Sequence, residues 1–424
     1  MVLAIMTLVA DDTTKLNLTG IYYIQAANGQ TVYGEIIRQK MKSLLEPKII
    51  LDAMNSIEIF SGAGGLAKGL ELAGITHQAF VEWNPDACNT LRQNYGDELV
   101  FEGDVRDFSF SDYKNVDIIA GGPPCQPFSL GGKAKGFNDK RDMFPSAISA
   151  IRTLMPKAFI FENVKGLLRE SFSDYFNYII LQLKYPEIEL TSKDWTQNLE
   201  TLKSIDKKGI SNSLKYQVLY QLINAADYGV PQKRERVIIV GFRDDLGIQW
   251  SFPSHTHSED ALLWQKYVTE DYWKRHNITN PEDASISNAI KNKLIQKYGI
   301  FSPEDKPWQT IRDAFDGLKL PNRDGDESML WNAKPYPGHT GSGYDEPSKT
   351  IKAGDHGVPG GENMIKFSDG ETRYLSISEA KRIQTFPDDY IITGSWTEAM
   401  RQLGNAVPVQ LAYIIGNSVI SAIA

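Results

Sequence analysis

The chain has 424 residues, more than one hydrophobic core usually holds, so at least two domains are expected. Its hydrophobic (42%) and charged (23%) fractions are ordinary for a globular protein. Two cysteines are too few for a disulfide framework, and no stretch has the pattern of a signal peptide or a membrane span. We therefore expect a cytoplasmic protein. The net charge of −8 disfavours nucleic acid as a partner without excluding it, because phosphate binding needs only a local basic patch.

The first clear α/β unit begins after an N-terminal extension, residues 1–55, for which pairing with the core, DNA binding and support of a dimer are all possible roles. Residues 56–60 form an apolar strand, a turn with Gly62, Gly64 and Gly65 follows, and residues 66–73 have helical spacing. Strand, glycine turn and helix in this order are typical of a nucleotide-binding βα unit, although the turn alone is weak evidence.

Acidic residues end the next two predicted strands. The strand at residues 79–82 ends in Glu82, at about the position where nucleotide-binding folds carry the acid that binds the ribose. The strand at residues 99–103 is followed by Asp104, which could accept a hydrogen bond from an adenine amino group. Each acid alone is equally consistent with a solvated strand end. In series, the acids predict a site for a nucleoside cofactor.

A fourth predicted strand, residues 116–120, leads into Gly-Gly-Pro-Pro-Cys-Gln-Pro-Phe-Ser at 121–129. Glycines permit torsions that other residues avoid and prolines fix φ, so this loop should be stiff and should present Cys125 at a sheet edge. The alternative is that Cys125 is a small buried hydrophobic residue, as most free cysteines are.

The fifth predicted strand, residues 158–164, follows a helix at 143–155 and carries Glu162 after four apolar residues. A partly desolvated carboxyl suits a group that donates or shares a proton. The alternative is a helix cap or an acid paired with a neighbouring arginine. Residues 174–215 are polar and predict a helical excursion, and residues 216–222 predict another strand.

Two arginines enter the last predicted strand of this region, residues 237–241. Strand alternation would place Arg234 and Arg236 on one face, where two guanidinium groups make a good site for an anion or a carbonyl oxygen.

Periodicity weakens in residues 251–364, where aromatic, His, Gly and Pro residues become frequent, which predicts a recognition surface dominated by loops. The histidines lack the spacing of metal ligands, so no metal is expected. Regular structure returns with a helix at 376–384, in which Ser378 is the expected cap, and ends with an apolar helix at 409–423.

Together these stretches resemble the cytosine-C5 DNA methyltransferases. The resemblance covers nearly all of the chain after residue 55 except the middle of the recognition region, and the short motifs occur in the family's order. The matching stretches are 60–65, Glu82, Asp104, 123–126, 162–164, 232–236, 373–386 and 402–408.

The resemblance implies an α/β, Rossmann-like fold that depends on S-adenosyl-L-methionine, with a mostly parallel sheet and one antiparallel edge. A smaller, loop-rich target-recognition domain is inserted before the C-terminal helix, and DNA lies between the two parts. The implied division is an extension at 1–55, a catalytic and cofactor-binding domain at 56–250, target recognition at 251–365 and a returning C-terminal part at 366–424.

The resemblance also implies a cofactor pocket, whose product form holds S-adenosyl-L-homocysteine. Phe60 would lie near the adenine, Glu82 would hold the ribose and Asp104 the adenine amino group. The full implied set is Phe60, Gly62, Gly64, Gly65, Glu82, Trp83, Asp104, Val105, Pro123, Asn405 and Val407.

The implied reaction is methyl transfer to C5 of a cytosine flipped out of duplex DNA. Cys125 would add to C6, Glu162 would bind N3, and Arg236, supported by Arg234, would hold O2. No side chain is assigned to remove the C5 proton, and ordered water would serve. The implied DNA contacts are Gln126, Ser129, Lys133, Arg141, Thr350, Lys352 and His356.

Three other functions compete with this reading. An RNA cytosine methyltransferase uses the same core, but the Cys-Phe-Thr stretch of the tRNA-modifying branch is absent. A non-catalytic DNA-binding derivative is disfavoured by the intact Cys125, Glu162 and Arg236. A nicotinamide dehydrogenase shares the βα unit but has no use for a Pro-Pro-Cys loop.

The resemblance further implies a bacterial modification enzyme, active as a monomer on double-stranded DNA. It would protect DNA from a cognate restriction endonuclease without needing to bind it. Residues 339–363 look like those of relatives that modify short GC-rich palindromes of the GGNCC or GGWCC kind.

Overall fold

The computed structural model describes residues 54–124, 142–192, 194–209, 213–281, 284–319, 321, 330–331, 333–335, 340–353, 363–367 and 369–424. The expected N-terminal extension therefore lies outside the described residues, apart from its last two positions.

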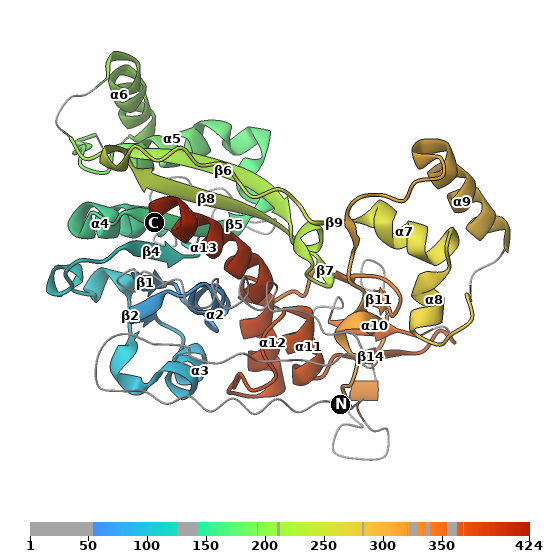
Figure 1. The fold of residues 1–424 in the computed structure, drawn as a ribbon. Coiled ribbons are helices and arrows are strands. Elements are labelled where there is room, and N and C mark those ends of the chain that lie inside the picture. Colours follow the sequence, from blue (N-terminus) through green and yellow to red (C-terminus); the bar gives the residue numbers. More distant parts are fainter. Residues whose placement is uncertain are drawn as a thin grey trace, which may run out of the picture. The chain divides into compact units, whose positions relative to one another are not determined.

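A seven-stranded sheet organises the described part of the chain, with strand order β3-β2-β1-β4-β5-β8-β6 (Figure 1). β8 runs antiparallel to both β5 and β6, and the other adjacent strands are parallel, which confirms the expectation of a mostly parallel sheet with an antiparallel edge. The strands are β1 Asn55–Ile59, β2 Thr76–Glu82, β3 Val100–Glu102, β4 Ile118–Gly121, β5 Ala158–Val164, β6 Tyr216–Asn224 and β8 Glu235–Arg243.

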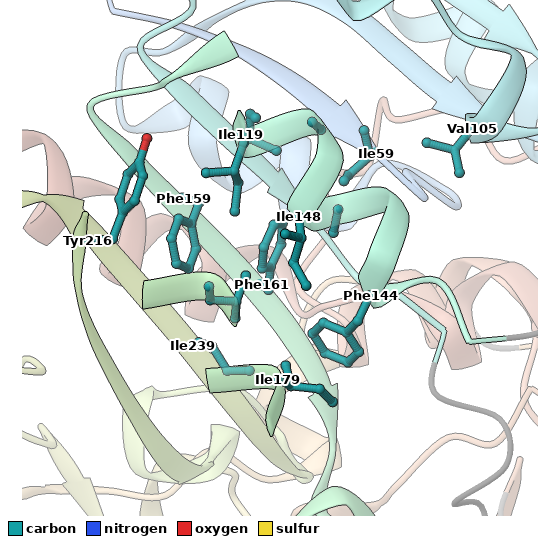
Figure 2. Packing of buried hydrophobic residues seen from close by; sticks show 14 of the residues in the cluster. Ile59, Val105, Ile119, Phe144, Ile148, Phe159, Phe161, Ile179, Tyr216 and Ile239 are labelled. Atoms are coloured by element: carbon teal, nitrogen blue, oxygen red, sulfur yellow. The ribbon is translucent and has the colours of Figure 1, made fainter. Parts of the chain in front are cut away.

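Helices cover both faces of this sheet because the central strands are apolar on both sides. On one face, Phe159 and Phe161 of β5 pack with Ile148 of α4 and Ile179 of α5 (Figure 2). On the other face, Ile160 belongs to a cluster that α2 and α13 complete. The helices around the sheet are α2 Gly65–Leu72, α3 Pro85–Tyr95, α4 Phe144–Leu154, α5 Ser173–Lys184, α6 Trp195–Lys208 and α13 Val409–Ile423.

The last helix, α13, packs directly on α2, the first helix of the described part of the chain. A Cβ atom on Gly69 of α2 would overlap Ala412, and one on Gly416 of α13 would lie 2.5 Å from Leu70. Such spacing needs glycine on both helices, because close-packed interiors do not absorb an extra methyl group cheaply. The C-terminal helix α13 is therefore in direct contact with the helix that follows β1.

The stretch Trp396–Ile423 is long and apolar enough to cross a membrane by composition, and it is the one such stretch within the described segments. It consists of two helices, α12 (Trp396–Asn405) and α13, and half of its most apolar window is buried inside the protein. Most of the buried apolar side chains of α13 pack against α2 and the sheet, and most of those of α12 belong to a separate cluster.

The prediction that loops dominate residues 251–364 is wrong for the first half of that region. Ser258 caps a helix by accepting a hydrogen bond from the Ala261 amide, and apolar residues spaced at helical intervals in 284–298 form another helix. The helices are α7 Glu259–Tyr267, α8 Asp271–Arg275, α9 Ala284–Tyr298 and α10 Ile311–Ala314. Short strands accompany them: β7 Gln232–Lys233, β9 His257–Ser258, β10 Lys306–Pro307, β11 Ser342–Gly343, β12 Ser348–Lys349, β13 Met364–Lys366 and β14 Thr372–Tyr374.

The cap of α11 (Ile377–Ile383) also differs from the prediction. Ser376, and not Ser378, accepts the hydrogen bond from the Glu379 amide, and the Glu379 carboxylate accepts one from the Ser376 amide in return. This capping box uses Glu379, three residues after Ser376, so the Ser-x-x-Glu spacing identifies the helix start better than the nearest serine does.

A buried polar cluster lies beneath α2. Ser56 Oγ donates to Glu58 Oε1 at 3.1 Å and lies 2.9 Å from His77 Nδ1, and Glu58 and His77 come from the neighbouring strands β1 and β2. Burial raises the pKa of Glu58 to about 8 and lowers the pKa of His77 to about 4. Both side chains are therefore mainly neutral in the folded protein at neutral pH.

Glu58→Gln is expected to flatten the pH dependence of stability between pH 6.5 and 8. Above the ordinary value of 4.5, unfolded Glu58 has lost a proton that the folded state keeps, so stability falls as pH rises through about 8. His77 has the opposite effect, but only below its ordinary value of 6.5. Relative to Glu58→Gln, the wild type should lose about 1.4 kcal/mol more per pH unit in this window.

Denaturant unfolding at both ends of the window measures this difference. Glu71→Gln, which changes an exposed carboxylate paired with Lys68 on α2, should keep the wild-type slope. An equal slope for wild type and Glu58→Gln would contradict the assignment.

Candidate active site

The loop that carries Cys125 has a well-defined stem. Cys125, Gln126, Ser129, Lys133 and Arg141 lie outside the described residues, but the chain on either side is held. The Met143 amide donates to the Pro124 carbonyl at 3.1 Å, and Asn163 Nδ2 donates to the Pro123 carbonyl at 2.8 Å. The described residues on either side of 125–141 are therefore bound to each other and to the end of β5.

A buried ion pair lies beside this stem. Arg236 Nε of β8 lies 2.6 Å from Glu162 Oε1 of β5, and both side chains are largely buried. The pair has ion-pair distance, but its N–H direction does not meet hydrogen-bond geometry, so neither atom is fully satisfied. A Cβ atom on Gly122 would lie 3.4 Å from Glu162 Oε2. The absence of a side chain at Gly122 therefore lets the carboxylate lie close to the backbone there.

The structure confirms that Glu162 is buried. It also shows the pairing with an arginine that was the alternative explanation for this acid. An acid and a guanidinium at the ends of adjacent strands can bind complementary donor and acceptor groups of one planar ligand. A ligand that bonds to both side chains would have to replace or share their contact.

Arg234 does not share a face with Arg236, contrary to the prediction. The strand is interrupted at Arg234, between β7 and β8, and the side chain is fully buried. Its Nη1 donates to the Ile351 carbonyl at 3.2 Å, and its Nη2 donates to the carbonyls of Gly404 and Ala406 at 2.9 and 3.0 Å. These bonds direct the guanidinium inward, so Arg234 does not extend the Glu162–Arg236 site.

Glu82, at the end of β2, organises the predicted cofactor side. Its Oε2 accepts from the Gly62 amide at 2.8 Å, and its Oε1 accepts from the amides of Trp83 and Asn84 at 2.9 and 2.8 Å. A carboxylate has about four acceptor positions, so Oε2 keeps capacity for one more donor. The neighbouring Trp83 side chain is 79% exposed and offers a flat apolar face.

The glycine turn before α2 is strained and close-packed. Phe60 has φ of 55°, a left-handed value that is costly for a residue with a bulky side chain and that is concentrated at functional sites. Gly62 and Gly64 also have positive φ. A Cβ atom on Gly65 would overlap the Val407 carbonyl, so the turn contacts the segment just before α13.

The remaining predicted cofactor residues differ in their exposure. Asp104 is paired with Arg106, whose side chain lowers the pKa of Asp104 to about 2. Val105, Pro123 and Val407 are buried, and Asn405 is exposed at the end of α12. Asp104 is thus a carboxylate at neutral pH. The sequence Asp-Val-Arg at 104–106 did not indicate that Asp104 pairs with Arg106.

Of the predicted DNA contacts in the recognition region, Thr350 and Lys352 are described and His356 is not. Thr350 Oγ1 donates to the Lys233 carbonyl at 2.8 Å, next to the pairing of β12 with β7. The Lys352 side chain is exposed. The recognition segment is therefore joined to the strand that leads into Arg236.

Sequence reasoning missed two buried glutamines near these residues. Gln232 Oε1 accepts from the Ile351 amide at 3.1 Å, and Gln232 Nε2 donates to Gln384 Oε1 at 3.1 Å. Gln384 Nε2 donates in turn to the carbonyls of Leu403 and Ala406.

Within the described ranges, no three His, Cys, Asp or Glu side chains are arranged to hold a metal ion.

Comparison with protein families gives an independent result. The family model described as C-5 cytosine-specific DNA methylase matches residues 54–187 and 190–421. The type II methyltransferase M.Eco47II of Escherichia coli is 34% identical, over 88% of this chain and 81% of its own. The type II methyltransferase M.NgoMIV of Neisseria gonorrhoeae is 32% identical, over 87% of this chain and 97% of its own.

Solved structures agree on the fold. The Dnmt2 methyltransferase of S. pombe is similar with a TM-score of 0.53, 16% identity, and coverage of 87% of this chain and 98% of its own. A putative DNA modification methyltransferase encoded within an E. coli prophage gives a TM-score of 0.51 at 21% identity, over 87% and 99% of the two chains. The family match covers most of the chain and includes every element of the site described above, and we conclude that the protein belongs to the C-5 cytosine-specific DNA methylase family.

Proposed function

We propose that this methylase transfers a methyl group from S-adenosyl-L-methionine to C5 of a cytosine flipped out of duplex DNA, through a covalent adduct of Cys125. The observation that carries the proposal is the Glu162–Arg236 pair, 2.6 Å apart at the stem of the Cys125 loop. A cytosine has the matching groups: O2 accepts from a guanidinium, and N3 with its amino neighbour bonds to a carboxyl group.

The proposed chemistry follows from the reactivity of the base. The Cys125 thiolate forms a bond to C6, and the C5=C6 electron pair becomes available at C5. C5 takes the methyl group, whose bond to the sulfonium breaks. Water removes the C5 proton, the electron pair re-forms the double bond, and the thiolate leaves. Glu162 stabilises the charge that develops at N3, and Arg236 holds O2.

The described residues fit a nucleoside cofactor. Glu82 and Asp104 place carboxylates after the adjacent strands β2 and β3, and Oε2 of Glu82 retains acceptor capacity for a ribose hydroxyl. The exposed Trp83 indole is suited to stack on an adenine. Bound S-adenosyl-L-methionine would supply the electrophilic methyl group, and this chain's part is to orient it and to exclude water.

Glu82→Gln is expected to raise the KM for S-adenosyl-L-methionine about 10-fold or more, because a hydrogen bond to a charged group contributes about 1.5–3 kcal/mol. Glu102→Gln is a matched control, since Glu102 faces Glu82 in the β2–β3 register but is exposed and paired with Arg92. Steady-state kinetics at saturating DNA would measure both. An unchanged KM for Glu82→Gln would contradict this placement of the ribose.

The activity itself is tested by incubating the purified protein with labelled S-adenosyl-L-methionine and either unmethylated plasmid or transcribed tRNA. Bisulfite sequencing would then locate the product. We expect C5 methylation of plasmid cytosines within one short motif. Transfer to tRNA alone would overturn the proposal in favour of an RNA substrate.

The biological role that we propose is protection of DNA from a cognate restriction endonuclease, by a cytoplasmic monomer that need not bind the endonuclease. Its similarity to type II methyltransferases supports this role. The proposed target is a GC-rich palindrome of the GGNCC or GGWCC kind. A plasmid propagated with the enzyme should resist an endonuclease of that specificity, and cleavage of methylated plasmid would rule the target out.

A further inference from the structure

Arg234 lies where three functional segments of the chain meet. Its guanidinium bonds to Ile351, which lies between the candidate DNA contacts Thr350 and Lys352. It also bonds to Gly404 and Ala406, which flank Asn405 of the predicted cofactor pocket. Along the chain, Arg236 of the cytosine site is two residues away.

Other contacts reinforce the same junction. Gln232 and Gln384 bond to each other and hold the Ile351 amide and the Leu403 and Ala406 carbonyls. A Cβ atom on Gly404 would overlap the Ala353 amide nitrogen, so the end of α12 packs directly on the recognition segment. We call the group Gln232, Arg234 and Gln384 the buried hub.

We propose that Arg234 is a positioning residue that couples cofactor binding to target recognition. This inference rests on the proposed function. The bonds of Arg234 all go to main-chain carbonyls of the two segments, so a shift of residues 404–407 towards a bound cofactor has to move residues 350–353 or break a hydrogen bond. By linkage, correct DNA must then strengthen cofactor binding by the same factor.

The hydrogen bonding of the buried hub is incomplete, which favours a rearrangement. Arg234 Nε is buried and has no hydrogen-bond partner among the described residues, although Nη1 and Nη2 are bonded. A buried donor without a partner is unfavourable, so the described arrangement does not satisfy all the donors of the hub. A ligand that moves either segment can therefore shift the hub towards a different set of bonds.

The test measures coupling rather than activity alone. Binding of S-adenosyl-L-homocysteine would be measured by calorimetry with no DNA, with a duplex carrying the mapped target, and with a duplex differing at one base pair. For the wild type we expect the target duplex to tighten binding about 5-fold or more, and the altered duplex to tighten it less. For Arg234→Lys, which keeps the charge but not the fork of donors, the factor should fall below about 2-fold.

Arg373→Lys provides the matched control. Arg373 is as buried as Arg234, but its ion pair with Glu379 stays within one short segment. It should lose stability and retain the wild-type coupling factor. Arg234→Gln supplies a second variant if Arg234→Lys does not fold. Its single uncharged amide cannot reach the carbonyls of both segments as the guanidinium fork does, so it should also lower the coupling factor.

The outcomes separate the two proposals. A wild type that binds the cofactor but does not methylate DNA would refute the proposed function. A wild type that methylates its target but shows no coupling would refute the inference alone. A folded Arg234→Lys, or a folded Arg234→Gln, with the wild-type coupling factor would also refute the inference.

Discussion

Cys125→Ala is expected to reduce methyl transfer at least about 10⁴-fold, because alanine has no nucleophile to add to C6 and cytosine C5 is unreactive without that addition. Substrate binding should be retained within a few-fold, since the Glu162–Arg236 pair and the loop stem are untouched. Initial rates of label transfer to plasmid, with filter binding of the same DNA, measure the two quantities.

Cys88 supplies the control for the only other thiol in the chain. It is fully buried, its Sγ contacts the Glu82 carbonyl, and burial raises its pKa to about 12, so it is a thiol and not a thiolate at neutral pH. Cys88→Ala should therefore stay active.

Duplexes with 5-fluorocytosine at the target make the comparison sharper, because fluorine cannot leave C5 as a proton does and the adduct persists. Wild type and Cys88→Ala should form a denaturation-resistant complex, whereas Cys125→Ala should form none. A denaturation-resistant complex with Cys125→Ala would show that Cys125 is not the nucleophile.

Glu162→Gln is expected to lower kcat about 10²–10³-fold, the usual cost of removing one group that stabilises developing charge or transfers a proton. Glutamine preserves the size of the side chain and can still accept from Arg236, so DNA affinity should change little. Single-turnover kinetics would distinguish slow chemistry from weak binding.

The nearby Glu235 serves as the matched residue for this experiment. It precedes Arg236 and forms an exposed ion pair with Lys165, and exposed pairs contribute little. Glu235→Gln should keep kcat within about 2-fold. A kcat for Glu162→Gln within a few-fold of the wild type would remove Glu162 from the chemistry.

Elements with strong local signals could be predicted from the sequence almost to the residue. The apolar run of β5 follows Pro156 and agrees with the structure at both ends, and α13 starts directly after Pro408 as expected. Such boundaries depend on neighbouring residues alone, and so a pattern of apolar residues and prolines is sufficient.

Contacts between distant segments could not be predicted in the same way. The alternation rule assumed an unbroken strand through Arg234 and Arg236, but the chain leaves the sheet at Arg234 to reach carbonyls that lie more than a hundred positions later in the sequence. The Glu58–His77 contact similarly depends on the register of β1 with β2. No local pattern encodes either arrangement.

The packing of α13 on α2 has a consequence for synthesis of the protein. A ribosome adds about 5–20 residues per second, so α2 waits on the order of tens of seconds for the helix that covers it. Until then Leu70 and the apolar face around it have no partner from the end of the chain. Contacts between segments this far apart also slow folding. Truncations that remove α13 should therefore yield aggregated protein, and nascent chains should depend on chaperones until α13 has been synthesised.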